Sequence, residues 1–165
     1  MIWASILIVV LVSCVFFYNQ LAKLDSLAAT AWQDLFIHFE RRAELINQLP
    51  DEHFRKSIDE LCRQARQQSA VKERQFAENK LGNELKRYWQ DAENDGRLKN
   101  NLELRQLKQK FAAAEEDLQN ARRHYNAAVR DYNVALHTVP TCWIAHSTKA
   151  EEKIFFKTGD LETDK

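Results

Sequence analysis

Hydrophobic and polar positions divide the chain into an apolar start and a long region of helical periodicity. Residues 2–18 contain no charged side chain. In a helix that rises about 1.5 Å per residue, this run is roughly 25 Å long, near the lower limit for crossing the hydrocarbon of a bilayer. The pattern predicts a transmembrane helix over 1–18 that holds the protein in a lipid bilayer through residues 2–18. Aromatic side chains near its two ends are typical of interfacial anchors: Trp3, Phe16, Phe17 and Tyr18.

Two alternatives to a membrane-spanning helix stay open. A cleaved secretory signal usually has a basic start and a small-residue cleavage site, and neither is present here. A lipid chain on Cys14 is the other, because Leu11-Val12-Ser13-Cys14 has the form of a lipobox, although apolar residues continue past the cysteine. Basic residues follow the apolar run and none precedes it, so the positive-inside rule favours a cytoplasmic helical domain. These residues are Lys23, Arg41 and Arg42.

From Gln20 to Gln48, apolar side chains recur at steps of three and four, which predicts an amphipathic helix. No helix breaker separates it from the apolar start, so the two form one helix in this interpretation. Pro50 ends it, because the proline ring removes a backbone donor and clashes with the preceding turn. The expected buried stripe is Leu21, Leu24, Ala28, Trp32, Leu35, Phe36, Phe39, Ala43 and Ile46, and the polar side includes Arg41 and Arg42.

A second helical stretch begins near Asp51-Glu52 and extends to the turn at Asn94-Asp95-Gly96. Its pattern weakens around Ser69, so residues 51–93 form either one helix or two helices joined by a hinge there. The expected buried stripe is Phe54, Ile58, Leu61 and Ala65, followed by Phe76, Leu81, Leu85 and Trp89.

The last long segment has neither glycine nor proline from Arg97 to Val139, and Asn100 with Glu103 is a plausible helix start. Its seam keeps a heptad spacing, which favours packing within the chain or a coiled coil shared by a homo-oligomer. Pro140 ends the helix, and Trp143, Ile144, Ile154, Phe155 and Phe156 then form a short helix or hook. The seam is Leu104, Leu107, Phe111, Ala114, Leu118, Ala121, Tyr125, Ala128, Tyr132 and Ala135.

These elements predict an all-α protein, with a single amino-terminal transmembrane helix followed by an antiparallel bundle of three to four long helices. The bundle occupies residues 19–156, and a polar tail over 157–165 is expected to be disordered. The 165 residues include 24 basic and 24 acidic side chains, and this balance gives no reason to expect a nucleic-acid partner.

The residues also disfavour several classes of chemistry. Three glycines are too few for a phosphate-binding loop, a dinucleotide fingerprint or a nucleophile elbow. The three cysteines form no C-x-x-C pair, and no histidine follows a glutamate by three positions, as a di-iron bundle requires. We therefore expect no metal, no cofactor and no enzymatic activity, with Cys62 as a small core or boundary residue.

Several motifs resemble the LemA family: Tyr18-Asn19, Ala31-Trp32, Arg41 to Ile46, and the run from Asn120 to Asn133. The last run is similar to the family signature A-R-x-x-Y-N-x-A-V-x-x-Y-N. The turn at Asn94-Asp95-Gly96 and the residues after Pro140 depart from the usual family pattern. The resemblance implies a membrane-anchored helical bundle and supplies no reaction.

The first functional hypothesis is a non-enzymatic membrane protein that presents its bundle to protein partners as a scaffold or adaptor. The alternative is a binding module in which Arg41, Arg42, Tyr125 and Tyr132 line a groove for a peptide or a small anionic ligand. In the competing structural interpretation, Arg41 and Arg42 bridge carboxylates of a neighbouring helix, for instance in the run Glu115-Glu116-Asp117. The candidate interaction or signature residues are Arg41, Arg42, Tyr125, Asn126, Tyr132 and Asn133.

Overall fold

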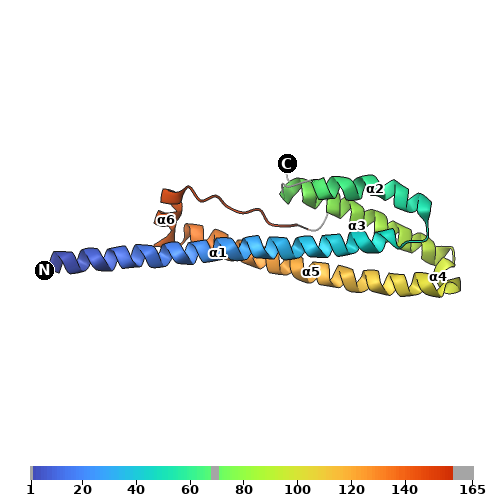
Figure 1. Ribbon diagram of the computed structural model, residues 1–165, viewed down its shortest axis with the longest axis horizontal. Coiled ribbons are helices and arrows are strands. Elements are labelled where there is room, and N and C mark those ends of the chain that lie inside the picture. Colours follow the sequence, from blue (N-terminus) through green and yellow to red (C-terminus); the bar gives the residue numbers. More distant parts are fainter. Residues whose placement is uncertain (1, 68–70, 158–165) are drawn as a thin grey trace. The chain divides into compact units, whose positions relative to one another are not determined.

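The computed structural model describes residues 2–67 and 71–157 (Figure 1). Every regular element in these two ranges is a helix, so the predicted all-α class is confirmed. The predicted hinge at Ser69 and residues 158–165 of the predicted tail lie outside the described residues. The helices are α1 (Ile2–Asn47), α2 (Glu52–Gln67), α3 (Val71–Asn94), α4 (Arg97–Asn100), α5 (Leu102–His137) and α6 (Thr141–Thr148).

The chain forms two compact units. Unit 1 contains Met1–Asp34 and Arg123–Phe155, and unit 2 contains Leu35–Arg122 and Phe156–Lys165. Each unit combines segments that are distant in the sequence, because α1 and α5 each contribute residues to both.

The apolar start and the first amphipathic stretch form one continuous helix, as predicted. Within α1, the segment from Ser5 to Asn47 is long and apolar enough, by length and composition, to cross a membrane. The side chains near its start are exposed on successive positions, including Leu7, Ile8, Val9 and Val10. No packing inside the protein therefore accounts for the apolar composition of this part of α1.

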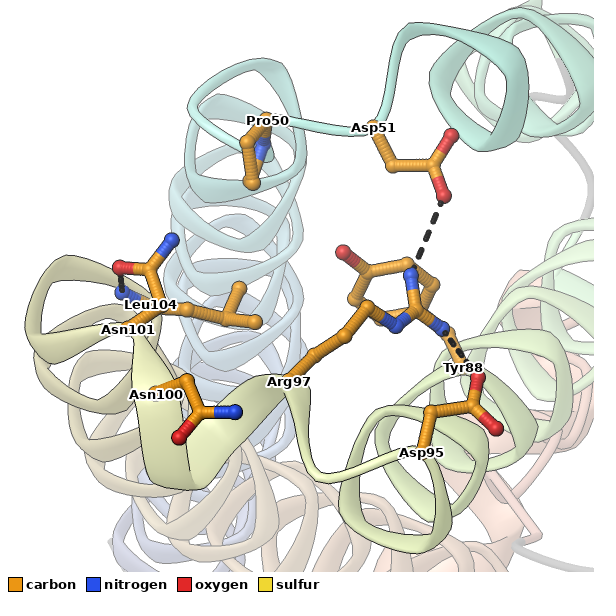
Figure 2. Close-up of a pocket in the computed structure, with 8 residues that line it drawn as sticks. All are labelled: Pro50, Asp51, Tyr88, Asp95, Arg97, Asn100, Asn101 and Leu104. Atoms are coloured by element: carbon orange, nitrogen blue, oxygen red, sulfur yellow. Dashed lines mark hydrogen bonds and ion pairs between the residues drawn. The ribbon is translucent and has the colours of Figure 1, made fainter.

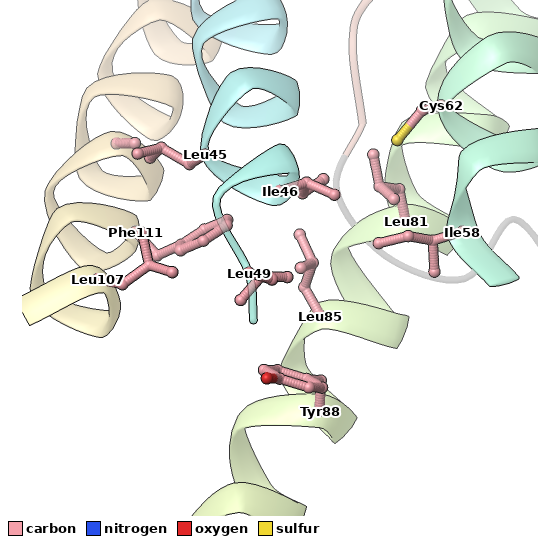
Figure 3. Close-up of a cluster of buried hydrophobic side chains, with 11 residues drawn as sticks. Leu45, Ile46, Leu49, Ile58, Cys62, Leu81, Leu85, Tyr88, Leu107 and Phe111 are labelled. Atoms are coloured by element: carbon pink, nitrogen blue, oxygen red, sulfur yellow. The ribbon is translucent and has the colours of Figure 1, made fainter. Parts of the chain in front are cut away.

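Unit 2 has a hydrophobic core to which α1, α2, α3 and α5 all contribute. In Figure 3 the last turns of α1 carry Leu45 toward Leu107 and Phe111 of α5, and Ile46 toward Leu81 of α3. Helices α2 and α3 pack against each other, so residues 51–93 contain two helices (Figure 1). The core members are Leu45, Ile46, Leu49, Ile58, Cys62, Leu81, Leu85, Tyr88, Leu107, Phe111 and Ala114.

The helix starts in unit 2 use short polar side chains. The backbone N–H of Phe54 donates to Oδ1 of Asp51 at 3.0 Å, as expected for a cap before α2. The predicted start at Asn100 is wrong by one residue, because the N–H of Leu104 donates to Oδ1 of Asn101 at 3.0 Å. Asn100 instead ends the short helix α4, which buries Leu98 in a small apolar cluster.

Unit 1 packs α1 against α5, α6 and the segment that follows α6. Leu21 of α1 clusters with Tyr132 and Leu136 of α5 and with Ala145 of α6. The ring centroids of Trp32 and Tyr125 are 5.2 Å apart. Helix α6, which begins directly after Pro140, is the short helix that the sequence predicted there.

We call residues 151–157, which have no regular secondary structure, the strap. The Tyr125 hydroxyl donates to the Ile154 carbonyl at 2.9 Å. The Asn133 side chain donates to the Lys153 carbonyl and accepts from the Lys153 N–H, both at 2.9 Å. Tyr125 and Asn133 thus hold the part of the strap that belongs to unit 1.

The predicted stripes need three corrections. Phe36 and Phe76 are exposed, whereas Arg42, which the pattern put on the polar side, is buried. Phe36 contacts Arg74, which belongs to a charged cluster in this part of unit 2. The seam of α5 is confirmed at nine of its positions, all buried, and Ala135 is half-buried beside the buried Leu136.

Candidate binding groove

The aromatic ring of Phe39 in α1 lies among three arginines of unit 2. The guanidinium carbons of Arg74, Arg42 and Arg122 are 5.2, 5.9 and 6.0 Å from its ring centroid. Arg74 also lies 4.1 Å from the ring centroid of Phe36. Such cation–π contacts stabilise a cation most when water is excluded, and all three arginines are less than 5% exposed.

Glu78 of α3 is the buried counter-ion of this cluster. Its Oε2 atom accepts a short hydrogen bond from Nη2 of Arg42, and the same Nη2 donates to the Glu78 carbonyl at 3.4 Å. Oε1 of Glu78 is 3.6 Å from Nη2 of Arg74. Burial raises the pKa of Glu78, and the charges of Arg42 and Arg74 act in the opposite direction.

Positive charge exceeds negative charge in the buried part of the cluster. Arg42, Arg74 and Arg122 face one buried carboxylate, Glu78, because the side chain of Glu115 is 46% exposed. Glu115 lies 3.5 Å from Arg42 and 3.9 Å from Arg122. Desolvation lowers the pKa of Arg74 and of Arg122. Among the described residues, the Nε atoms of all three arginines have no hydrogen-bond partner, and these atoms are themselves enclosed.

A groove of about 640 Å³ opens between α3 and α5 beside this cluster. Arg42, Glu78 and Arg122 lie at one end of its lining, and Glu93 and Lys108 lie at the other. A Cβ atom on Gly82 would be 3.6 Å from Nη1 of Arg42, so the arginine reaches the groove wall at this glycine. The other lining residues are Asn79, Asn83, Leu85, Lys86, Trp89, Gln90, Phe111, Ala112 and Gln119.

Residues 156–157 of the strap lie at the arginine end of the groove. Phe156 is 1% exposed, and its ring centroid lies 5.5 Å from that of Phe39 and 5.3 Å from the guanidinium of Arg122. The N–H of Lys157 donates to Oε1 of Gln75 at 3.1 Å, and the Asn79 side chain donates to the Lys157 carbonyl at 3.3 Å. Because Asn79 also lines the groove, non-helical backbone is already bound at its edge.

A second cavity, of about 480 Å³, lies where the α1–α2 connection meets α4 (Figure 2). Arg97 is 3.6 Å from Asp51 and 3.5 Å from Asp95, and its guanidinium lies 5.6 Å from the ring centroid of Tyr88. Arg97 thus pairs with two carboxylates, Asp51 in the α1–α2 connection and Asp95 in the α3–α4 connection. This arrangement is typical of a structural ion-pair network rather than of a binding site.

The family model named LemA family matches residues 31–165. The chain belongs to the LemA family. No curated protein matches the sequence. The resemblance drawn from the sequence motifs is therefore confirmed over most of the chain.

The LemA-like motif residues are placed differently in the two units. Arg41 is exposed and pairs with Asp117 at 2.9 Å, and Arg42 contacts Glu115, so both arginines bridge the acidic run of α5. Of the four residues proposed for a groove, Arg42 lines the groove described above. Tyr125 and Tyr132 belong to unit 1, where Tyr125 bonds the strap and Tyr132 lies 5.0 Å below the ammonium of Lys153.

The remaining motif residues and the aromatic anchors are on α5 and α1. Asn126 is half-buried on α5, and Asn133 bonds the strap. Trp3, Phe16 and Tyr18 are exposed, and Phe17 is half-buried. Within residues 2–67 and 71–157, no group of three His, Cys, Asp or Glu side chains is placed to hold a metal ion.

The sequence analysis did not select Arg74, Gln75, Glu78 or Arg122 as candidate site residues, although Arg122 is the arginine of the family signature. The spacing contained a signal for three of them. Steps of three and four counted back from Leu85 and Leu81 lead to Glu78 and then to Arg74. Steps back from Tyr125 and forward from Leu118 meet at Arg122. The buried stripes were assigned from apolar residues alone, so these charged positions were not included.

Proposed function

We propose that this LemA-family protein is a non-enzymatic, single-pass membrane protein that presents its helical domain to protein partners as a scaffold or adaptor. The observation that carries the membrane part of the proposal is the start of α1, where large apolar side chains are exposed on all sides of a helix. Exposing such a surface to water is unfavourable, and a bilayer removes it from water.

The domain beyond the span is proposed to be an antiparallel bundle of three to four long helices. In unit 1, Leu21 packs with Tyr132 and Leu136, whereas the later Trp32 contacts the earlier Tyr125. This order supports opposite directions for α1 and α5. The long seam of α5 also supports helix packing with a second copy of the chain as a further mode of association.

The helical domain is proposed to face the cytoplasm. Lys23 follows the apolar run closely, and no basic residue precedes it in the sequence. Acylation of Cys14 stays an alternative means of attachment, since Cys14 is exposed on α1.

Alkaline extraction of membranes tests the anchor. The full chain should stay in the membrane pellet, and a matched chain that begins at Asn19 should move to the supernatant. The intact mass of the extracted protein is measured in the same sample, because a cleaved signal or an added lipid changes the mass. Release of the full chain by alkali, or a mass that lacks residues 1–18, would contradict the proposal.

A second candidate function is a binding module whose groove takes a peptide or a small anionic ligand. The buried arginines at the end of the α3–α5 groove favour it, since Arg42, Arg74 and Arg122 face one buried carboxylate, Glu78. Titration with citrate tests the small-anion form through the melting temperature. A rise in melting temperature that is lost in Gly82→Glu supports this form, and an unchanged melting temperature contradicts it.

A further inference from the structure

We propose that the α3–α5 groove binds an acidic segment of a partner protein in extended conformation, with a carboxylate of that segment on the guanidinium groups of Arg122 and Arg42. The inference rests on the proposed role as a protein-binding module and names the chemistry of its partner. Peptide binding is measured on purified protein, so a negative result there is distinguishable from failure of the membrane anchor.

Charge is the first argument for an acidic ligand. Arg42 and Arg122 are both more than nine-tenths buried and both line the groove, and together with Arg74 they face one buried carboxylate, Glu78. A carboxylate accepts two charge-assisted hydrogen bonds from a guanidinium group at once, so it binds there more strongly than a neutral acceptor does. The acidic residues of the groove are already engaged, Glu78 and Glu115 by Arg42 and Glu93 by Lys108.

The walls of the groove suit a segment that also carries apolar side chains. Leu85, Trp89 and Phe111 lie along it, between the arginine end and the pair Glu93–Lys108. From Glu78 to Glu93, α3 extends roughly 22 Å, given about 1.5 Å per residue. An extended chain covers this length with roughly seven residues at about 3.3 Å each. In an extended chain, successive side chains point to opposite faces. A segment in which acidic and apolar residues alternate would therefore present its acidic side chains on one face and its apolar side chains on the other.

The strap supplies a precedent for the conformation of the ligand. At the end of the groove, Asn79 donates to the carbonyl of Lys157, and Gln75 accepts from its N–H. Side-chain amides bound to backbone groups in this way fix an extended chain without regard to its sequence. The specificity then comes from the arginines and from the apolar wall.

The probe is a fluorescein-labelled peptide in which glutamate alternates with leucine, and its matched control carries glutamine in place of glutamate. Both are titrated against the full chain in detergent micelles, and binding is followed by fluorescence polarisation. The acidic peptide should bind at least about tenfold more tightly than the glutamine peptide, since only the carboxylates form ion pairs with the arginines. Added salt should weaken the binding of the acidic peptide.

Four variants test whether the peptide binds in the groove. Arg122→Gln should weaken the acidic peptide by about tenfold, and Arg130→Gln, which removes an exposed arginine from the same helix, should leave it unchanged. Gly82→Glu adds a carboxylate beside Arg42 and should block binding, whereas Gly82→Gln should block it less. Circular dichroism checks the fold of each variant, and the Gly82 pair tests the site without removing a buried arginine.

Equal binding of the two peptides would overturn the proposal, as would an acidic peptide that fails to bind at concentrations up to about 1 mM. Unchanged affinity in both Arg122→Gln and Gly82→Glu would place the peptide elsewhere and would also overturn it. A further arm uses the chain shortened after Lys157. Binding seen only in this shortened chain would show that residues 158–165, rather than a partner, occupy the groove.

Discussion

Arg42 of α1 and Glu78 of α3 form an ion pair inside unit 2, with 1% and 3% of their surfaces exposed. The two residues are 36 positions apart in the sequence. A shift of α1 along α3 would separate this pair and leave both charges buried without compensation. The pair therefore ties α1 to α3 at one position.

Replacement of Arg42 by alanine should destabilise the protein by about 3–5 kcal/mol, because it leaves the carboxylate of Glu78 buried with weaker compensation. Arg41→Ala is the matched control, and it should cost no more than about 1 kcal/mol, since Arg41 is exposed in its pair with Asp117. Chemical unfolding of the full chain in detergent, followed by circular dichroism, measures both. Equal losses for Arg41 and Arg42 would contradict the buried-pair account.

The sequence predicted the fold class, the continuity of α1, the turn at Gly96 and most of the α5 seam. These features follow from apolar spacing and from breakers, which act locally. The charged cluster around Phe39 could not be predicted in the same way. Arginine is usually found at the surface, and the burial of Arg42 is compensated by Glu78 and Glu115, which approach from other helices. The start of α5 was misplaced by one residue because Asn100 and Asn101 are both suitable caps.

The Tyr125 hydroxyl should contribute about 1 kcal/mol through its bond to the Ile154 carbonyl, so Tyr125→Phe should lower the free energy of unfolding by that amount. Tyr18→Phe, at an exposed position, is the control. Burial raises the pKa of Tyr125. The neutral phenol is thus favoured in the folded state, and its contribution is complete below the ordinary pKa of about 10. Stability should fall as the pH rises from there through the folded pKa.

The alkaline loss of stability should be smaller in Tyr125→Phe than in the wild type. Tyr88 and Tyr132 also have raised pKa values through burial, so part of the loss should persist. Denaturant unfolding at a series of alkaline pH values gives the comparison. An identical pH dependence in the two proteins would contradict a buried, neutral Tyr125.

The Cys62 thiol should be protected from modification in the native protein. It is buried in the core of unit 2, and burial raises its pKa, so the reactive thiolate is scarce. In a chain with Cys14→Ser and Cys142→Ser, maleimide should modify Cys62 at least about tenfold more slowly than in the same chain unfolded by urea. Comparable rates in the two states would mean that α2 does not pack on this core.

Gly82→Ala should stabilise the protein by about 0.5–1 kcal/mol. Gly82 lies inside α3, where alanine has the higher helix propensity. The added Cβ would lie 3.6 Å from Nη1 of Arg42, an ordinary contact distance. Denaturant unfolding measures the gain, and Gly96→Ala should be destabilising by contrast, because Gly96 has a positive φ of 70°. A loss of stability in Gly82→Ala would show that Arg42 needs this space.

Protease protection of a doubly tagged chain shows whether the start of α1 crosses the membrane once. One tag precedes Met1 and a different tag follows Lys165, and protease is added to right-side-out and to inverted membrane vesicles. With a single span and a cytoplasmic helical domain, the carboxyl-terminal tag is digested only in inverted vesicles and the amino-terminal tag only in right-side-out ones. Digestion of both tags in the same vesicles, or loss of the amino-terminal tag before protease is added, would contradict the single span.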